Sequence, residues 1–110
     1  MNNYSKNEIV LIKYPFSDLT TFKVRPAVIV GVDNILFDLF ITPLTSKTNN
    51  LIPGEFVLEN YLESGLFVET AIKRGLYTID RRLVIKKVGF ISNNDAIKLD
   101  HSIRLWLEIE

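Results

Sequence analysis

Short runs of aliphatic and β-branched residues, separated by polar stretches, occupy most of the chain before residue 92. Such runs are typical of short strands. The first run is apolar at successive positions, which predicts a strand covered on both faces. Asp33 and Asn34 separate two other runs and predict a tight antiparallel hairpin. In all, we predict one helical turn over 80–82 and strands over 8–14, 27–32, 35–41, 55–58, 66–72 and 84–91.

The last segment has the period of a helix. Ser92, followed three residues later by Asp95, resembles a capping box, and we predict a helix from 93 to about 108. The only histidine, His101, falls on the outer face of this helix and is expected at the surface. The stripe expected to face the core consists of Ala96, Leu99, Ile103 and Trp106.

These elements predict a mostly β fold with one C-terminal α-helix. Either a partly open barrel or a strongly curled sheet with the helix packed against it fits the pattern. The chain has 110 residues, of which 47% are hydrophobic and 24% charged, and these proportions match one globular domain spanning 1–110.

Charge and cysteine content exclude several classes of protein. Lys plus Arg and Asp plus Glu number 13 each, so any basic surface must be local. The absence of cysteine excludes disulfides, thiol catalysis and thiolate metal sites, and it suits a reducing compartment. The polar start lacks a signal-peptide core, and no apolar run is long enough to span a bilayer. We therefore expect a cytoplasmic protein without a membrane partner.

Cofactor chemistry has little support in the sequence. A single histidine cannot form a paired-histidine acid–base system, and no glycine-rich phosphate loop is present. The carboxylates are spread singly along the chain, without the clustering of an oxygen-ligand metal site. We expect no metal and no cofactor.

Arginine and hydroxyl chemistry remains. Arg25 precedes Pro26 at the entrance of a predicted strand, and the segment 42–47 supplies several hydroxyl groups and a lysine. A guanidinium matches the geometry of phosphate oxygens, and a threonine hydroxyl can add a hydrogen bond to the same group. Ordinary surface positions explain these residues equally well. The loops at 16–23 and 45–54 can lie at opposite ends or face each other, and both arrangements fit the sequence.

Basic and aromatic residues also favour RNA. Three basic pairs can follow an RNA backbone: Lys73 with Arg74, Arg81 with Arg82, and Lys86 with Lys87. Phe16, Phe22 and Tyr77 can stack on unpaired bases. The alternative is a solvated rim with aromatic residues in the core.

Several blocks in order carry a family resemblance. In chain order, the blocks are Glu8-Ile-Val-Leu-Ile, Tyr14-Pro-Phe-Ser-Asp-Leu, Arg25-Pro-Ala-Val-Ile-Val, Ile41-Thr-Pro-Leu-Thr-Ser-Lys, Tyr77-Thr-Ile-Asp-Arg-Arg-Leu and Lys86-Lys-Val-Gly-Phe-Ile-Ser. In these blocks the chain resembles the MazF/PemK-like (Kid-type) toxins of type II toxin–antitoxin systems.

This resemblance implies a small SH3-like, partly open barrel that forms a homodimer. It also implies a sequence-specific, metal-independent endoribonuclease that cleaves single-stranded RNA (mRNA) and is neutralised by a cognate antitoxin. In that reaction the ribose 2′-hydroxyl attacks the adjacent phosphate and leaves 2′,3′-cyclic phosphate and 5′-hydroxyl ends. The resemblance assigns catalysis to Arg25 and Thr45.

The positions expected to bind RNA are Phe16, Asp18, Lys23, Ser46, Lys47, Arg74, Tyr77 and Arg81. Two positions depart from the family pattern. Asn7 stands where many members carry glycine, and Arg74-Gly75 stands where many carry an acidic residue followed by Gln or Lys.

Two other functions fit the same resemblance. CcdB-like toxins share the fold but act on DNA gyrase through the end of the terminal helix, which contains Trp106 here. A toxin that has lost catalysis and retains only antitoxin binding is the other. The core stripe that includes Trp106 favours a packing role for this residue.

Overall fold

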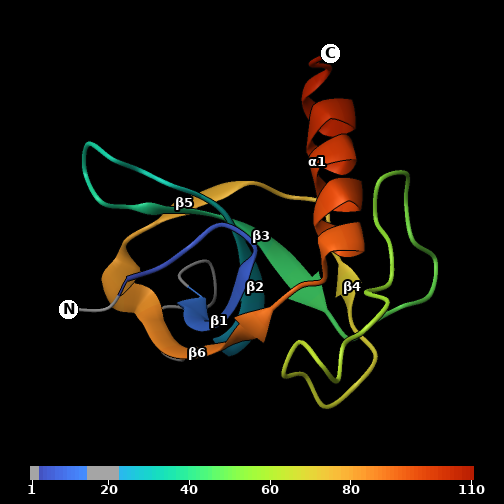
Figure 1. The fold of residues 1–110 in the computed structure, drawn as a ribbon, viewed down its shortest axis with the longest axis horizontal. Coiled ribbons are helices and arrows are strands. Elements are labelled where there is room, and N and C mark those ends of the chain that lie inside the picture. The colour runs from blue at the N-terminus through green and yellow to red at the C-terminus, as the bar shows by residue number, and fades with distance from the viewer. Residues whose placement is uncertain (1–2, 15–22) are drawn as a thin grey trace.

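The computed structural model describes residues 3–14 and 23–110, and its strands all pair in antiparallel fashion. A single α-helix, α1 (Asn93–Leu107), follows the last strand (Figure 1). The preceding elements are β1 (Glu8–Tyr14), β2 (Lys23–Val32), β3 (Leu39–Thr45), β4 (Ala71–Ile72), β5 (Tyr77–Ile79), the 3₁₀ turn η1 (Arg81–Leu83) and β6 (Val84–Phe90). The predicted mostly β fold with one C-terminal helix is confirmed.

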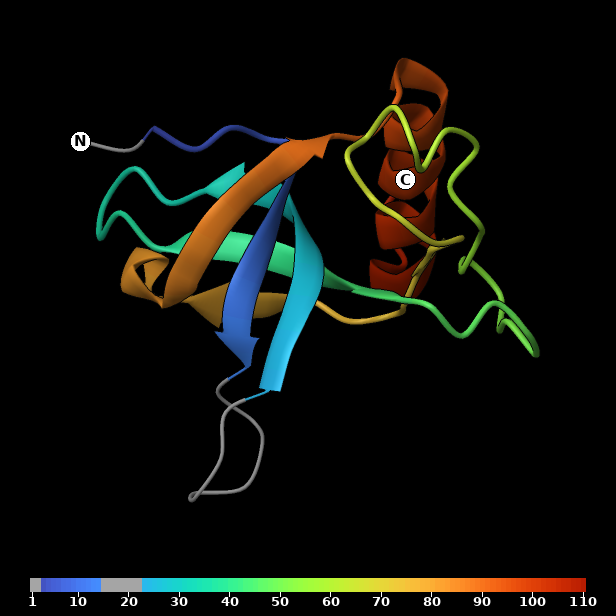
Figure 2. The same ribbon diagram turned by 90° about the horizontal axis from the view of Figure 1, so that it is seen from below.

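The sheet is strongly curled and stays open. Its strand order is β4-β3-β2-β1-β6, and β5 pairs with β3 beside this path. The register shifts within β1–β6 and near Gly31 in β2–β3, and such bulges bend a strand and increase its twist. β6 therefore curves around without closing against the opposite edge (Figure 2). This is the partly open barrel that we expected.

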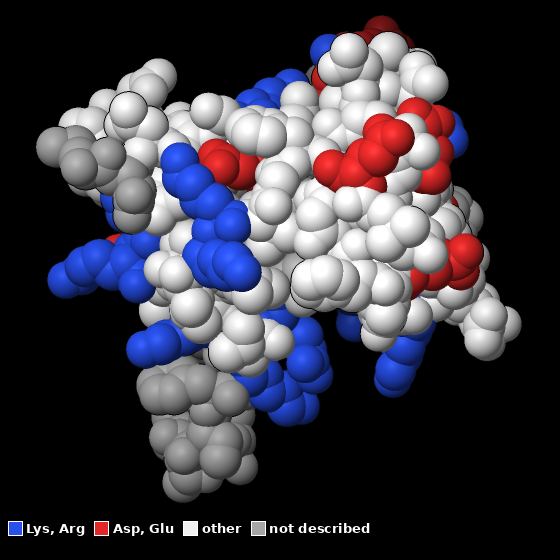
Figure 3. Space-filling model, turned by 60° about the horizontal axis from the view of Figure 1, so that its bottom comes forward, with Lys and Arg blue, Asp and Glu red and all other residues white. Residues whose placement is uncertain are grey.

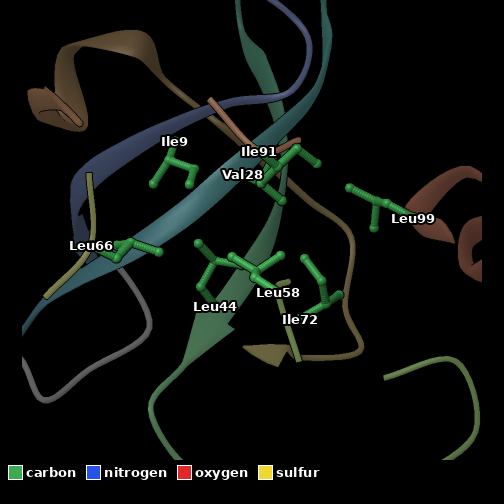
Figure 4. Close-up of a cluster of buried hydrophobic side chains, with 8 residues drawn as sticks. All are labelled: Ile9, Val28, Leu44, Leu58, Leu66, Ile72, Ile91 and Leu99. Carbon is green, nitrogen blue, oxygen red and sulfur yellow. The ribbon is translucent and has the colours of Figure 1, made fainter. Parts of the chain in front are cut away.

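Both faces of the sheet are buried, as the continuous apolar run in β1 predicts. Ile9 and Val10 are adjacent, have no exposed surface and belong to different clusters. The helix-side cluster, drawn in Figure 4, consists of Ile9, Val28, Leu44, Leu58, Leu66, Ile72, Ile91 and Leu99. The barrel cluster, inside the curl, consists of Val10, Ile12, Ala27, Ile29, Leu39, Ile41 and Ile79.

Helix α1 begins and packs as its sequence predicts. The Ser92 hydroxyl accepts a hydrogen bond from the Asp95 N–H at 3.1 Å, which caps the first turn. Leu99 is buried in the helix-side cluster, and Ala96, Ile103 and Trp106 pack against it. His101 is exposed, as expected. In the described part of the chain, no helix has the length and apolar character needed to cross a membrane.

The tight hairpin and the start of the predicted strand 35–41 are wrong. β3 begins only at Leu39, and a wider loop precedes it. In this loop the Asp33 carbonyl accepts from the Phe37 N–H at 3.0 Å, and the Asp33 carboxylate accepts from the Ile35 N–H at 2.8 Å. The apolar side chains of the loop stay largely exposed, although the Arg81 guanidinium lies 5.7 Å from the Phe37 ring centre.

The predicted strands 55–58 and 66–72 are largely wrong. Only the bridge between Val57 and Ala71 and the short strand β4 form there. The two segments also exchange hydrogen bonds, from the Leu58 N–H to the Thr70 carbonyl at 2.9 Å and from the Ile72 N–H to the Phe56 carbonyl at 2.8 Å. The Leu66 N–H instead closes a local turn onto the Tyr61 carbonyl at 2.9 Å. A short apolar run indicates burial, but it does not reveal whether a partner strand lies beside it.

The departure from the family pattern at Asn7 has a simple backbone explanation. Asn7 has a φ of 74°, in the left-handed region that glycine adopts freely. Among other residues, asparagine is one of the best tolerated there. Asparagine can therefore replace glycine at this position with little strain.

Candidate functional site

A groove of about 580 Å³ opens where β1 ends, β2 begins and β3 ends. Arg25 and Thr45 both lie in its wall. The full lining is Tyr14, Lys23, Val24, Arg25, Pro26, Pro43, Leu44, Thr45, Ser46, Lys47, Leu66, Val68, Thr70 and Lys73. Arg25 and Thr45 therefore share one groove, and residues 15–22 of the first loop lie outside the described part of the chain.

The strand register brings these two residues together. Ala27 of β2 pairs with Pro43 of β3, and the two strands are antiparallel. Arg25 and Thr45 lie two residues beyond this last pair on their strands, and the alternation of side chains puts them on the same face as Ala27 and Pro43. This face carries the barrel cluster deeper in the curl, because Ala27 belongs to that cluster. The candidate site is therefore the open end of the barrel, where the inward-facing positions change from apolar to polar.

The Arg25 guanidinium is available to a ligand. The residue is exposed, and its hydrogen bond to the Val24 carbonyl is long, at 3.4 Å. No carboxylate within residues 3–14 and 23–110 forms an ion pair with it. Most of its donors therefore remain free for an anionic group in the groove.

The Thr45 hydroxyl has a defined orientation. Its oxygen accepts a hydrogen bond from the Lys47 N–H at 3.1 Å. That bond uses an acceptor position and leaves the hydroxyl proton free to be donated. Thr45 can therefore donate to a phosphate oxygen opposite the Arg25 guanidinium.

Among the described residues, the ionic side chains that line the groove are all cations: Lys23, Arg25, Lys47 and Lys73. A groove lined by one sign of charge concentrates the electrostatic field. On the face drawn in Figure 3, most Lys and Arg side chains lie over the left and lower parts, and most Asp and Glu side chains lie on the right. The molecule has zero net charge but separates its charges on the surface.

Tyr14 closes one side of the groove. Burial raises the pKa of its phenol above the ordinary 10.0. The neighbouring Tyr77, which hydrogen-bonds to Tyr14, raises this pKa further, whereas the positive charge of Arg25 lowers it. Tyr14 is therefore a neutral hydrogen-bonding group at pH 7.

The sequence profile of the PemK-like, MazF-like toxins of type II toxin–antitoxin systems matches residues 5–107, a range that includes the whole groove. The chain belongs to this toxin family. Its fold agrees with solved structures at low sequence identity. The Mycobacterium tuberculosis toxin MazF-mt6 superposes with a TM-score of 0.75 at 16% identity, over 94% of this chain and 98% of that one.

An endoribonuclease in complex with its cognate antitoxin, from a mycobacterial species, has a TM-score of 0.76 at 13% identity and covers 98% of both chains. At such identities the likeness shows a shared fold. No curated protein sequence matches the chain significantly.

The structure brings part of the predicted RNA-binding set of this toxin into the groove. Lys23, Ser46 and Lys47 line it, and Tyr77 contacts the groove residue Tyr14. Phe16, Asp18 and Phe22 lie outside the described residues.

Three predicted RNA-binding residues within the described ranges do not line the groove themselves: Arg74, Tyr77 and Arg81. Arg81 is engaged elsewhere, because its Nε donates to the Phe37 carbonyl at 2.6 Å and its guanidinium lies 5.6 Å from the Tyr4 ring centre. Arg74 follows the groove residue Lys73 and is exposed, and its N–H donates to the Glu55 carboxylate at 2.8 Å.

Other groove residues were absent from the predicted site: Tyr14, Leu66, Val68, Thr70 and Lys73. The sequence marked Lys73 as half of a basic pair that can follow an RNA backbone. Its place in the groove, however, comes from a hydrogen bond to a distant strand. Its N–H donates to the Pro43 carbonyl at 2.9 Å, which extends the short pairing of β4 with β3. Nothing in the local sequence around residue 73 indicates this neighbour.

Within the described ranges, no three His, Asp or Glu side chains are grouped so that they could hold a metal ion.

Proposed function

We propose that this toxin is a sequence-specific, metal-independent endoribonuclease that cleaves single-stranded RNA, including mRNA. The observation that carries the proposal is that Arg25 and Thr45 line the same groove, together with the cations Lys23, Lys47 and Lys73. A polyanion fits this charge, and an arginine with a hydroxyl fits one of its phosphates.

The proposed chemistry needs no protein nucleophile. The ribose 2′-oxygen attacks the adjacent phosphorus and loses its proton to water, the bond from phosphorus to the 5′-oxygen breaks, and that oxygen takes up a proton. The products are a 2′,3′-cyclic phosphate and a 5′-hydroxyl. Negative charge grows on the non-bridging phosphate oxygens, and a guanidinium held in place stabilises it more than it stabilises the ground state.

Arg25 suits electrostatic stabilisation better than proton abstraction. The guanidinium is a permanent cation in proteins, so it has no free lone pair with which to take up a proton. It can donate a proton towards the departing 5′-oxygen more readily than it can accept one from the 2′-hydroxyl. Thr45 supplies a neutral hydrogen bond to the same phosphate.

The proposal includes the biological setting implied by the family. We propose a single toxin domain over residues 1–110 that acts in the cytoplasm as a homodimer and is neutralised by a cognate antitoxin. Family membership supports each of these points. The similar endoribonuclease in complex with its cognate antitoxin supports the antitoxin in particular.

Cleavage of RNA without metal tests the proposal. The purified toxin is incubated with EDTA and a long single-stranded RNA, and the new ends are mapped. We expect 2′,3′-cyclic phosphate and 5′-hydroxyl ends at a recurring sequence. Arg25→Ala should fold normally and cleave about 10²- to 10³-fold more slowly, as for the loss of one transition-state donor. Arg104→Ala, which removes an exposed arginine of α1, is the matched control and should cleave like the wild type.

Intact RNA would reject the proposal. Trapped gyrase–DNA breaks would then indicate the CcdB-like alternative, and antitoxin binding alone would indicate a toxin that has lost catalysis. The surroundings of Trp106 favour neither, because its indole N–H donates to the Pro53 carbonyl at 3.0 Å and its ring packs against the helix-side cluster.

A further inference from the structure

Phe67 is 93% exposed, the most of any large hydrophobic side chain in the described ranges. Its neighbours on both sides, Leu66 and Val68, line the cationic groove. Because consecutive Cα atoms lie about 3.8 Å apart, the Phe67 backbone is at the edge of this groove. With so little of its surface buried, the phenyl ring adds almost nothing to the stability of the fold.

The loop that carries Phe67 is held on both sides. The Leu66 N–H donates to the Tyr61 carbonyl at 2.9 Å, and the Thr70 hydroxyl donates to the Val68 carbonyl at 2.8 Å. The next residue, Glu69, accepts a hydrogen bond from the Thr48 hydroxyl at 3.0 Å. The ring is therefore presented from an anchored loop.

We propose that Phe67 stacks on an unpaired base of the RNA whose backbone follows the cations of the groove. This inference rests on the proposed function, because it takes RNA as the substrate. An aromatic ring beside a positively charged groove is the arrangement with which proteins bind single-stranded nucleic acid. Stacking uses the face of any base, so Phe67 contributes affinity and positions the strand without specifying its sequence.

The charges around Phe67 favour RNA over a protein partner. The described part of the groove lining beside it has four cations and no acidic residue. Glu69 is the one carboxylate in this short stretch, and Thr48 already donates to it. An apolar protein partner would gain no favourable interaction from the cations of the groove. RNA offers a phosphate for these cations and a base for Phe67 at every nucleotide.

The test measures binding separately from cleavage. An RNA that the wild type cleaves is resynthesised with 2′-O-methyl groups, labelled, and titrated with the wild type and with Phe67→Ala, Phe67→Trp and Phe90→Ala. Inorganic polyphosphate is the probe without bases. Phe90 is the matched control because it is 53% exposed and lies far from the groove. It pairs with Glu8, the first residue of β1, whereas the groove lies at Tyr14, the last residue of that strand, about 20 Å away.

We expect Phe67→Ala to weaken RNA binding about 10-fold, with Phe67→Trp and Phe90→Ala close to the wild type. Polyphosphate binding should not change in any variant. For cleavage of unmodified RNA, Phe67→Ala should raise KM by a similar factor and leave kcat unchanged.

Several results would overturn the inference. Equal RNA affinity for Phe67→Ala and the wild type would reject stacking while leaving the proposed function intact. Equal RNA affinity with weakened antitoxin binding would assign Phe67 to the protein partner instead. If the wild type neither cleaves nor binds RNA, the proposed function fails, and this inference fails with it.

Discussion

Replacing Gly89 with alanine tests how closely β6 crosses the turn that leads into the groove. A Cβ atom at Gly89 would lie 2.9 Å from the Ser64 carbonyl carbon, and the carbonyl oxygen would be closer still. Carbon atoms pack at about 3.5 Å or more, so the turn would have to retreat by at least ~0.6 Å. Both atoms belong to the backbone, so no side-chain rotation can relieve the contact.

We expect Gly89→Ala to lower the free energy of unfolding by about 1–3 kcal/mol, the usual range for overpacking. For a domain of this size, that corresponds to a melting temperature lower by roughly 10 °C. Because Leu66 follows Ser64 closely and lines the groove, RNA binding should weaken as well. Urea unfolding followed by far-UV circular dichroism measures the stability, and the 2′-O-methyl RNA measures the binding.

Gly31→Ala is the matched control on another strand. Its Cβ atom would meet the Phe40 side chain at 3.3 Å, and that side chain is exposed and can move aside. Alanine also loses less backbone entropy than glycine on folding, so the change should be neutral or stabilising by about 0.5 kcal/mol. If both variants are equally stable, the steric argument for the crossing at Gly89 is refuted.

Two further predictions concern the helix. Leu99→Ala should lower the free energy of unfolding by about 2–5 kcal/mol because Leu99 is 1% exposed in the helix-side cluster. Leu105→Ala, at a position 57% exposed, should change it by less than about 0.5 kcal/mol. Equal losses for the two variants in urea unfolding would contradict this packing. Burial raises the pKa of the Asp95 carboxyl above its ordinary 3.8, so Asp95 disfavours the folded state increasingly as the pH rises through the folded pKa. Asp95→Asn does not ionise, and its stability relative to the wild type should therefore increase from about pH 4 to pH 7 in urea titrations. A difference that is constant over this range would show that the carboxyl pKa is not raised.

Local patterns in the sequence were enough to predict β1 and α1. β1 has the predicted bounds because its apolar run can be buried on both faces without knowledge of its neighbours. The capping residue Ser92 and the helical stripe act within a few residues of each other, so both were correct. The hairpin before β3 was wrong because its apolar residues suggested a strand, and only the packed structure shows that they stay largely exposed.

For the candidate site too, the sequence indicated some of the residues and the tertiary structure determined the others. The resemblance to the toxin family singled out Arg25 and Thr45, but the pairing of β2 with β3 brings them into one groove. Phe67 and Lys73 are distant in sequence from Arg25: hydrogen bonds in the segment between β3 and β4 hold the loop of Phe67, and the bond from the Lys73 N–H to the Pro43 carbonyl of β3 holds Lys73. Sequence periodicity indicates which face of an element is buried, because it depends on the geometry of that element alone. Which two faces meet depends on long-range packing, and only the tertiary structure determines it.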